Sequence, residues 1–276
     1  MHKSYSTTLK SSIKQLIFDW KRRLSIRVLQ PYPFENIYYC CTQKTGSQWL
    51  KRIFNDVSFY QYTGLLVDPY ENFGLRYASF DKALPKGTIG THLYFNYSTY
   101  FDIPKPSKYK TFFILRNPRD IVVSFYFSFK YSHALILPIV SELRQNLENL
   151  NFDDGLKFVI DKLSEFGLFE AQKSWITASS VDRDIKIFYY EDMAQNNQTF
   201  LENLFSYLNI SMPNSEFLDL CSRHEFQKMV GREQGSENIN SHYRKGVSGD
   251  WKNHFNEDTL DYFKQSTGDL LEVLGY

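Results

Sequence analysis

The chain has 276 residues, which is long for one domain and short for two, and α/β folds often exceed about 200 residues as a single unit. Its composition is 42% hydrophobic and 17% aromatic, which supports a large core and excludes a disordered chain. The net charge of +1 favours neither nucleic acid nor an anionic membrane as a partner, so any anion site must be local.

The N-terminal segment is basic and carries a short apolar piece at residues 16–18, which is too short to span a bilayer and is followed by Asp19. We expect residues 12–29 to form either an amphipathic helix that packs on the domain or a loose basic arm. The chain is therefore divided into an N-terminal arm, residues 1–31, and a single domain, residues 32–276.

The three cysteines, Cys40, Cys41 and Cys221, suggest neither a disulfide framework nor a metal-ligand spacing. Cys40 and Cys41 are adjacent within an apolar run, where cysteine behaves as a small hydrophobe. A reducing, cytoplasmic location is therefore expected.

The first predicted elements are a buried strand over 37–41 and a helix over 50–54, joined by a turn that contains Gly46. Unpaired N–H groups and the dipole of the first helical turn favour an anion in such a turn, and Lys44 adds a positive charge. The simpler interpretation is a lysine in an ordinary strand-to-helix turn, since surface lysines are common. The turn is not a P-loop, because a Walker lysine directly follows the last glycine, whereas Lys44 stands two residues before Gly46.

The next stretch, residues 60–86, is expected to be a long irregular loop with a helical piece over 71–80. Apolar runs over 88–92 and 109–115 predict two strands. Pro118 and an acidic residue in the following turn signal a helix start, so the strand-like residues after it are assigned to a buried helix.

Strands that alternate with helices predict an α/β domain with a mostly parallel central sheet that helices cover on both faces. Ligands of such folds bind at the C-terminal ends of the strands. Lys44, His92, Arg116 and Tyr190 all lie at or just after predicted strand ends, which predicts one shared site. The remaining predicted elements are helices over 142–150, 152–165 and 169–179, a strand over 185–190, a helix over 199–208, a polar loop over 231–249 and a terminal helix over 258–274.

A second anion site is predicted at Arg116, because Ser124 lies about two helical turns further on and both side chains can reach one anion. Alone, each would pass for an arginine at a strand end or a serine within a helix. A further basic group, Arg244-Lys245-Gly246, lies in the polar loop, where the alternative is a solvated charge pair. Two anion sites at one sheet edge suggest a nucleotide with phosphates at both ends of its ribose.

With these motifs the sequence resembles the cytosolic-type sulfotransferases, which use 3′-phosphoadenosine 5′-phosphosulfate (PAPS) as donor. Residues 44–49 resemble the family's 5′-phosphosulfate loop, residues 116–124 its 3′-phosphate segment, and residues 244–255 its C-terminal loop. Shorter matches lie between them, and the resemblance covers about residues 38–255. It implies a P-loop-like sulfotransferase fold, adenosine 3′,5′-bisphosphate (PAP) as product, and no requirement for a metal.

The resemblance also implies roles for individual residues. His92 would be the general base that deprotonates the acceptor, and Lys44 would stabilise the leaving phosphate, which fits the chemistry of in-line sulfuryl transfer. The donor would be bound through its 5′-phosphate by Lys44, Thr45, Gly46, Ser47 and Gln48, through its 3′-phosphate by Arg116, Ser124, Arg244, Lys245 and Gly246, and through its adenine by Trp49, Tyr190 and Phe226.

Three positions depart from the family pattern. Gly90 stands where the family often has a lysine, which removes one contact to the sulfonate. Gln48 replaces the usual threonine, although its amide can still donate to a phosphate. His224 begins a segment that lacks the usual hydroxyl side chains near the adenine.

The acceptor is expected to be a small molecule, such as a specialised metabolite, that is sulfated on a hydroxyl or a nitrogen. Its pocket is expected in the aromatic-rich loops around residues 60–80, 94–101 and 129–138. Acidic residues of the first loop, Asp68 among them, would suit a cationic acceptor. Neither a nucleic acid partner nor a membrane span is expected, and a homodimer stays open.

Two other functions remain as alternatives. A P-loop-type kinase that uses ATP would need a Walker lysine and a hydroxyl ligand for magnesium, and Lys44 is misplaced for that motif. A catalytically silent nucleotide-binding module would keep the phosphate-binding residues and lose the base, whereas both His92 and Lys44 are present.

Overall fold

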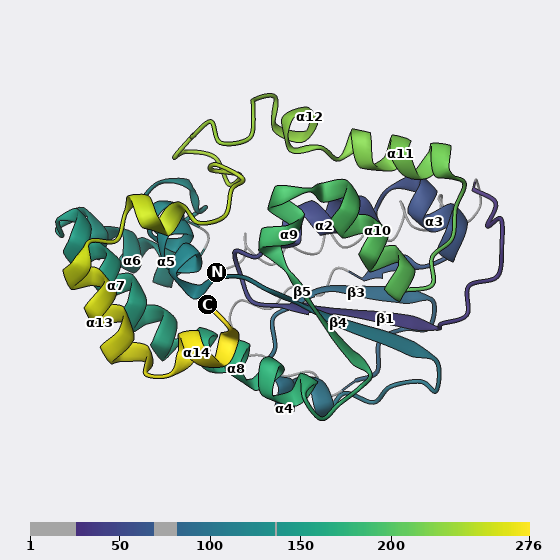
Figure 1. The fold of residues 1–276 in the computed structure, drawn as a ribbon, viewed down its shortest axis with the longest axis horizontal. Coiled ribbons are helices and arrows are strands. Elements are labelled where there is room, and N and C mark those ends of the chain that lie inside the picture. The colour runs from purple at the N-terminus through teal and green to yellow at the C-terminus, as the bar shows by residue number, and fades with distance from the viewer. Residues whose placement is uncertain (1–25, 69–81, 136) are drawn as a thin grey trace.

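The structure, a computed structural model, describes residues 26–68, 82–135 and 137–276 (Figure 1). The N-terminal arm expected up to residue 31 lies outside them, except for its last residues, which form no helix. The helical piece expected over 71–80 also lies outside the described residues. Within the described part, none of the helices combines the length and the apolar character that a bilayer-spanning helix requires.

Five parallel strands form the central sheet, in the order β2-β3-β1-β4-β5, which confirms the predicted parallel arrangement. The chain runs through β2 and β3 on one side of β1 and then crosses to β4 on the other side. Such a reversal of direction leaves a crevice at the carboxyl ends of the strands. The strands are β1 (Asn36–Cys41), β2 (Leu66–Asp68), β3 (Thr88–Leu93), β4 (Tyr109–Leu115) and β5 (Ile185–Tyr189).

Helices cover both faces of the sheet (Figure 1). One layer contains α2 (Ser47–Phe54), α3 (Val57–Thr63), α9 (Tyr190–Gln195), α10 (Asn197–Tyr207), α11 (Asn214–Arg223) and α12 (Phe226–Val230). The other side of the molecule contains α4 (Tyr97–Phe101), α5 (Pro118–Phe127), the π-helical segment η2 (Ser128–Ser132), α6 (Pro138–Glu148), α7 (Phe152–Glu165), α8 (Leu168–Ser179), the short η3 (Asp250–Asn253), α13 (Glu257–Thr267) and α14 (Leu270–Leu274).

The apolar run of β1 is continuous because both of its faces are buried. Tyr38 and Cys40 belong to the core beneath α5, α7 and α8, whereas Tyr39 and Cys41 belong to the core beneath α2 and α10. All three cysteines are free and buried, as expected for Cys40 and Cys41 from their apolar surroundings. The strand is thereby fixed on both faces, and its carboxyl end is held in a constant position.

Two predicted segments differ from the structure. The expected loop after residue 60 contains the end of α3 and the edge strand β2, a strand of only three residues that is stabilised by pairing with β3. The single terminal helix expected over 258–274 is divided into α13 and α14 at Gly268, whose φ of 59° and ψ of −125° are not helical. Both differences arise from single residues or tertiary pairing that periodicity does not reveal.

Other boundaries shift by a few residues. Helix α6 begins at Pro138, four residues before the expected start at 142, and Tyr190 begins α9 instead of ending β5. The short helices α4, α11 and α12 were not predicted. The helix predicted after Pro118 is confirmed as α5, and the polar loop over 231–249 contains neither helix nor strand.

Candidate active site

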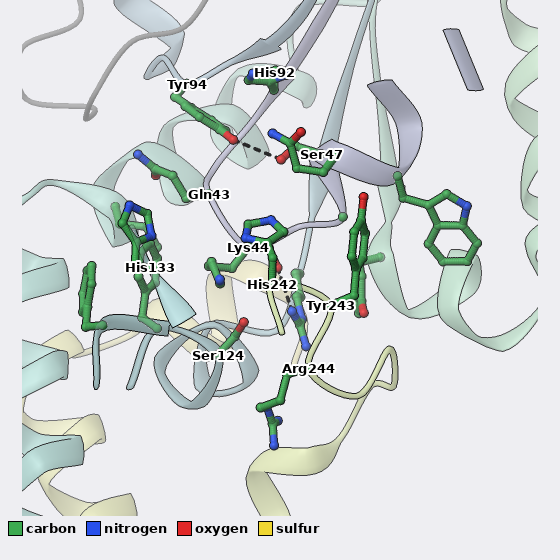
Figure 2. Close-up of a pocket in the computed structure, with 18 of the residues that line it drawn as sticks. Gln43, Lys44, Ser47, His92, Tyr94, Ser124, His133, His242, Tyr243 and Arg244 are labelled. Carbon is green, nitrogen blue, oxygen red and sulfur yellow. Dashed lines mark hydrogen bonds between the residues drawn. The ribbon is translucent and has the colours of Figure 1, made fainter. Parts of the chain in front are cut away.

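The carboxyl ends of the strands open into a cavity of about 550 Å³. All of the sequence-predicted site residues except Thr45 line it. Figure 2 shows Ser124 and Arg244 on one side of Lys44 and His92 on the other. The predicted residues that line the cavity are Lys44, Gly46, Ser47, Gln48, Trp49, His92, Arg116, Ser124, Tyr190, Phe226, Arg244, Lys245 and Gly246.

The turn between β1 and α2 is built from two left-handed residues, Lys44 with φ 67° and Gly46 with φ 78°. A Cβ atom at Gly46 would lie 2.3 Å from the Met193 side chain and 3.3 Å from the Tyr190 ring, so only glycine lets α9 approach this closely. No side chain caps the N-terminus of α2, which leaves its first amides available to an anion.

Thr45 has a different position from its neighbours. Its side chain is fully buried, and its hydroxyl donates a hydrogen bond of 2.8 Å to the carbonyl of Thr42. The hydroxyl therefore stabilises the turn and does not face the cavity.

Lys44 is one of four lysines and arginines that line the cavity, with Arg116, Arg244 and Lys245. Burial, with the positive charges of Arg116 and Arg244, lowers the pKa of its ammonium from 10.5 to about 7. Among the described residues that line the cavity, none is acidic. An anionic ligand would restore the ammonium to its protonated form, so this region suits a phosphate or sulfonate group.

Arg116 joins three parts of the site. One terminal nitrogen of its guanidinium donates to the carbonyl of Lys44 at 2.7 Å, the other donates to the carbonyl of Val247 at 3.3 Å, and the group lies 4.0 Å from the centre of the Tyr190 ring. Its Nε is buried and has no hydrogen-bond partner among the described residues. A buried unpaired donor is costly, and an anion bound here would satisfy it. Ser124 lines the same cavity from α5.

His92 lies near the end of β3, 2% exposed and with a φ of 43°, a conformation that a residue other than glycine adopts rarely. Its ring centre is 5.4 Å from that of Tyr94, and the Tyr94 hydroxyl shares a hydrogen bond of 3.0 Å with Ser47 in the first turn of α2 (Figure 2). The end of β3 is thereby connected to the anion-binding turn.

The polar loop over 231–249 brings Arg244, Lys245 and Gly246 into the cavity. Its end is fixed to α5 by the buried carboxylate of Asp120, which accepts hydrogen bonds from the backbone N–H groups of Gly249 at 2.6 Å and Trp251 at 2.9 Å. Sequence reasoning did not identify Asp120 in this role, because its position in the first helical turn already explained it.

Gly246 provides a local test of this loop. Its φ is 74°, and a Cβ atom would lie 2.4 Å from the ring of Phe226, which is 5% exposed. Gly231 has nearly the same φ, 73°, with nothing within 4 Å of the added atom. We expect Gly231→Ala to cost about 1–2 kcal/mol from backbone strain, and Gly246→Ala to cost at least about 1 kcal/mol more from overpacking. Urea unfolding of both variants measures the difference, and equal losses would contradict the close approach to Phe226.

The far end of the cavity is apolar, and sequence reasoning identified it only in part. Of the aromatic residues in the predicted acceptor loops, Tyr94 and Phe129 line the cavity, as does His133. Others from the described parts of those loops, such as Tyr97, pack elsewhere, and residues 69–81 lie outside the described residues. Leu137 lies within the predicted loop 129–138, whereas the lining side chains outside the predicted loops are Phe125, Ile139, Val140, Leu143, Leu163, Phe166 and Leu168.

Comparison with known proteins matches this chain to one family. A family model described as the sulfotransferase domain matches residues 35–275. Sulfotransferase 6B1 of Danio rerio is 30% identical over 178 residues, which are 63% of this chain and 55% of that protein. Sulfotransferase 1A1 of Mus musculus is 30% identical over 167 residues, which are 56% of this chain and 53% of that protein. The chain thus spans about half the length of the curated relatives it matches.

Solved structures show the same fold. One match is the crystal structure of mouse sulfotransferase SULT7A1 complexed with PAP, with a TM-score of 0.59 and 20% identity. The superposition covers 87% of this chain and 85% of the SULT7A1 chain. Another match is the structure of retinol dehydratase in a complex with retinol and PAP, with a TM-score of 0.51 and 16% identity. The superposition covers 87% of this chain and 82% of the retinol dehydratase chain. At these identities the likeness extends to the fold alone.

Proposed function

The chain belongs to the sulfotransferase domain family, and from this premise we propose that it transfers the sulfuryl group of PAPS to a hydroxyl, or a nitrogen, of a small-molecule acceptor. The observation that carries the proposal is the meeting of the Lys44 turn, His92 and Arg116 in one cavity. These residues come from the ends of three different strands, so their convergence depends on the fold and not on sequence proximity.

The residues present fit such a donor. The uncapped N-terminus of α2 and the Lys44 ammonium suit its 5′ end, and the unpaired Nε of Arg116, with Ser124 on the neighbouring helix, suits its 3′-phosphate. The aromatic side chains of Trp49, Tyr190 and Phe226 line the cavity and would contact the adenine. The Trp49 indole is held in place by a hydrogen bond of 2.7 Å to the carbonyl of His224.

His92 and Lys44 would divide the chemistry between them. When bound, the donor supplies a sulfuryl group on a phosphate that leaves as the new S–O bond to the acceptor forms. His92 would accept the proton of the acceptor hydroxyl, which makes its oxygen a stronger nucleophile. Lys44 would neutralise the electron pair that remains on the leaving phosphate oxygen. Both residues lie at the carboxyl end of the sheet, His92 in β3 and Lys44 after β1, and they line the same cavity.

The apolar end of the cavity supports a largely apolar acceptor body. It lies between η2, α6 and the α7–α8 connection and is lined mainly by aliphatic side chains. Among the described residues no acidic side chain lines it, Asp68 included, which favours a neutral acceptor over a cationic one. Three buried free thiols suit a reducing, cytoplasmic location, which we include in the proposal.

Labelled donors separate this function from its alternatives. We expect sulfated product from labelled PAPS with at least one member of a panel of hydroxyl- and amine-bearing metabolites, and no phosphorylated product from labelled ATP with magnesium. PAP should bind and raise the melting temperature, even before an acceptor is found. Labelled phosphate transfer from ATP would favour the P-loop-type kinase. PAP binding without turnover across a broad panel would favour the silent nucleotide-binding module.

A further inference from the structure

A buried carboxylate, Asp250, holds the basic residues of the C-terminal loop. Its side chain is 2% exposed, and it pairs with Arg244 and with Lys245, the latter at 2.6 Å. The Asn253 amide donates to it at 2.9 Å, and His254 Nε2 lies 3.2 Å from it. Burial alone would raise the pKa of this carboxyl, but the hydrogen bonds from these partners hold the pKa well below its usual range.

Asp250 lies behind the two cations as seen from the cavity. Arg244 and Lys245 line the cavity, whereas Asp250 and its other two partners, Asn253 and His254, do not. The carboxylate is itself fixed, because the backbone N–H groups of the residues on either side of it donate to Asp120 on α5. Glu237 also pairs with Arg244, but Asp250 contacts both cations, and its segment is attached to the helix that carries Ser124.

We propose that Asp250 is a positioning residue, which orients Arg244 and Lys245 toward a 3′-phosphate and so makes the site prefer nucleotides that carry one. The inference rests on the proposed donor and extends it to a residue that does not touch the ligand. Long basic side chains lose considerable rotamer entropy when they bind, and orienting them in advance reduces that cost.

The opposite effect is also physically reasonable, which makes the inference testable. Removing a negative charge near the cavity raises the local positive potential, and this alone would strengthen binding of every anion. Orientation acts only on the group that Arg244 and Lys245 contact. The ratio of affinities for PAP and for adenosine 5′-monophosphate (AMP), which lacks the 3′-phosphate, therefore distinguishes the two effects.

The test measures dissociation constants of PAP and AMP by calorimetry for the wild-type protein and Asp250→Asn at one ionic strength. We expect the preference for PAP over AMP to fall roughly tenfold to a hundredfold in the variant, with AMP affinity nearly unchanged. An unchanged ratio, or tighter binding of PAP, would overturn the inference. If Asp250→Asn does not fold, Asp250→Glu keeps the charge but displaces it, and the preference should fall in the same direction.

Asp56 provides a matched control. Its carboxylate is also held by an arginine and a histidine, Arg223 at 2.9 Å and His224 at 3.0 Å, and the same kind of hydrogen bonding holds its pKa low. Asp56→Asn should lose stability without changing the PAP to AMP ratio, whereas a fall equal to that of Asp250→Asn would show a general structural effect and overturn the inference. A wild-type protein with no preference for PAP would instead refute the proposed donor.

Discussion

Replacement of His92 by asparagine is expected to lower the turnover number by about 10²–10⁴ while the affinity for PAP stays nearly unchanged, because the variant loses only the general base. Asparagine is chosen because it tolerates a positive φ better than alanine, and His92 has a φ of 43°. The backbone at the end of β3 should thus be preserved. Steady-state rates with PAPS and an acceptor, together with PAP titrations, measure both quantities.

Two other histidines of the cavity provide the comparison. His133 and His242 both line it, and burial together with the charge of Lys44 lowers the pKa of each, that of His242 to about 4. If His242→Asn abolished turnover and His92→Asn did not, the role of the base would move to the C-terminal loop. If none of the three variants His92→Asn, His133→Asn and His242→Asn lost turnover, base catalysis by a histidine of this cavity would be wrong.

The location of the site was predictable because parallel strands share a direction. Once the apolar runs were assigned as parallel strands, the residues that follow them had to meet at one edge. Lys44, Arg116 and Tyr190 follow β1, β4 and β5, and His92 lies near the end of β3. A glycine turn identified the position of Lys44 and a proline at a helix start that of Arg116, whereas His92 and Tyr190 were identified by the ends of the apolar runs alone.

The apolar end of the cavity was not predictable in the same way. Leu143 on α6 and Leu163 on α7 have the spacing of ordinary core residues, and both are almost fully buried. Periodicity shows which face of a helix is covered, but it does not show whether a protein core or a ligand covers it. Only the packing of η2, α6 and α7 around a space reveals the difference.

Asp250 was missed for a related reason. In the sequence it is one acidic residue beside a tryptophan, and a carboxylate near basic residues usually belongs to a solvated surface. Its burial depends on Asp120, which fixes the loop to α5. Asp120 precedes Asp250 by 130 residues in the sequence. Contacts at this separation have no local signature.

Lys44 combines a functional position with a cost to stability. Its pKa of about 7 in the folded protein lies below the value of 10.5 expected in the unfolded chain. The unfolded chain therefore binds more protons between these values, and stability contributed by this residue falls as the pH drops from 10.5 to 7. The penalty is complete below pH 7. A residue retained at such a cost is typical of functional sites.

Replacement of Lys44 by methionine should therefore separate activity from stability. Methionine is unbranched, is one heavy atom shorter than lysine and meets the same strain at a φ of 67°, but it carries no charge to neutralise the leaving phosphate. We expect turnover to fall by about 10²–10³ or more, and the melting temperature to rise at pH 6 and to approach that of the wild type above about pH 10.5.

Lys173 provides a control, because its pKa is shifted in the opposite direction from that of Lys44. Its side chain is partly exposed and pairs with Asp269 at 2.6 Å, which raises the pKa of its ammonium. Lys173→Met should therefore keep its turnover and gain no stability at pH 6. A Lys44→Met protein that lost both turnover and stability would show that the ammonium holds the fold together. Because removal of a buried charge relieves an unfavourable state, a stable but inactive protein would place the value of Lys44 in its contact with the donor.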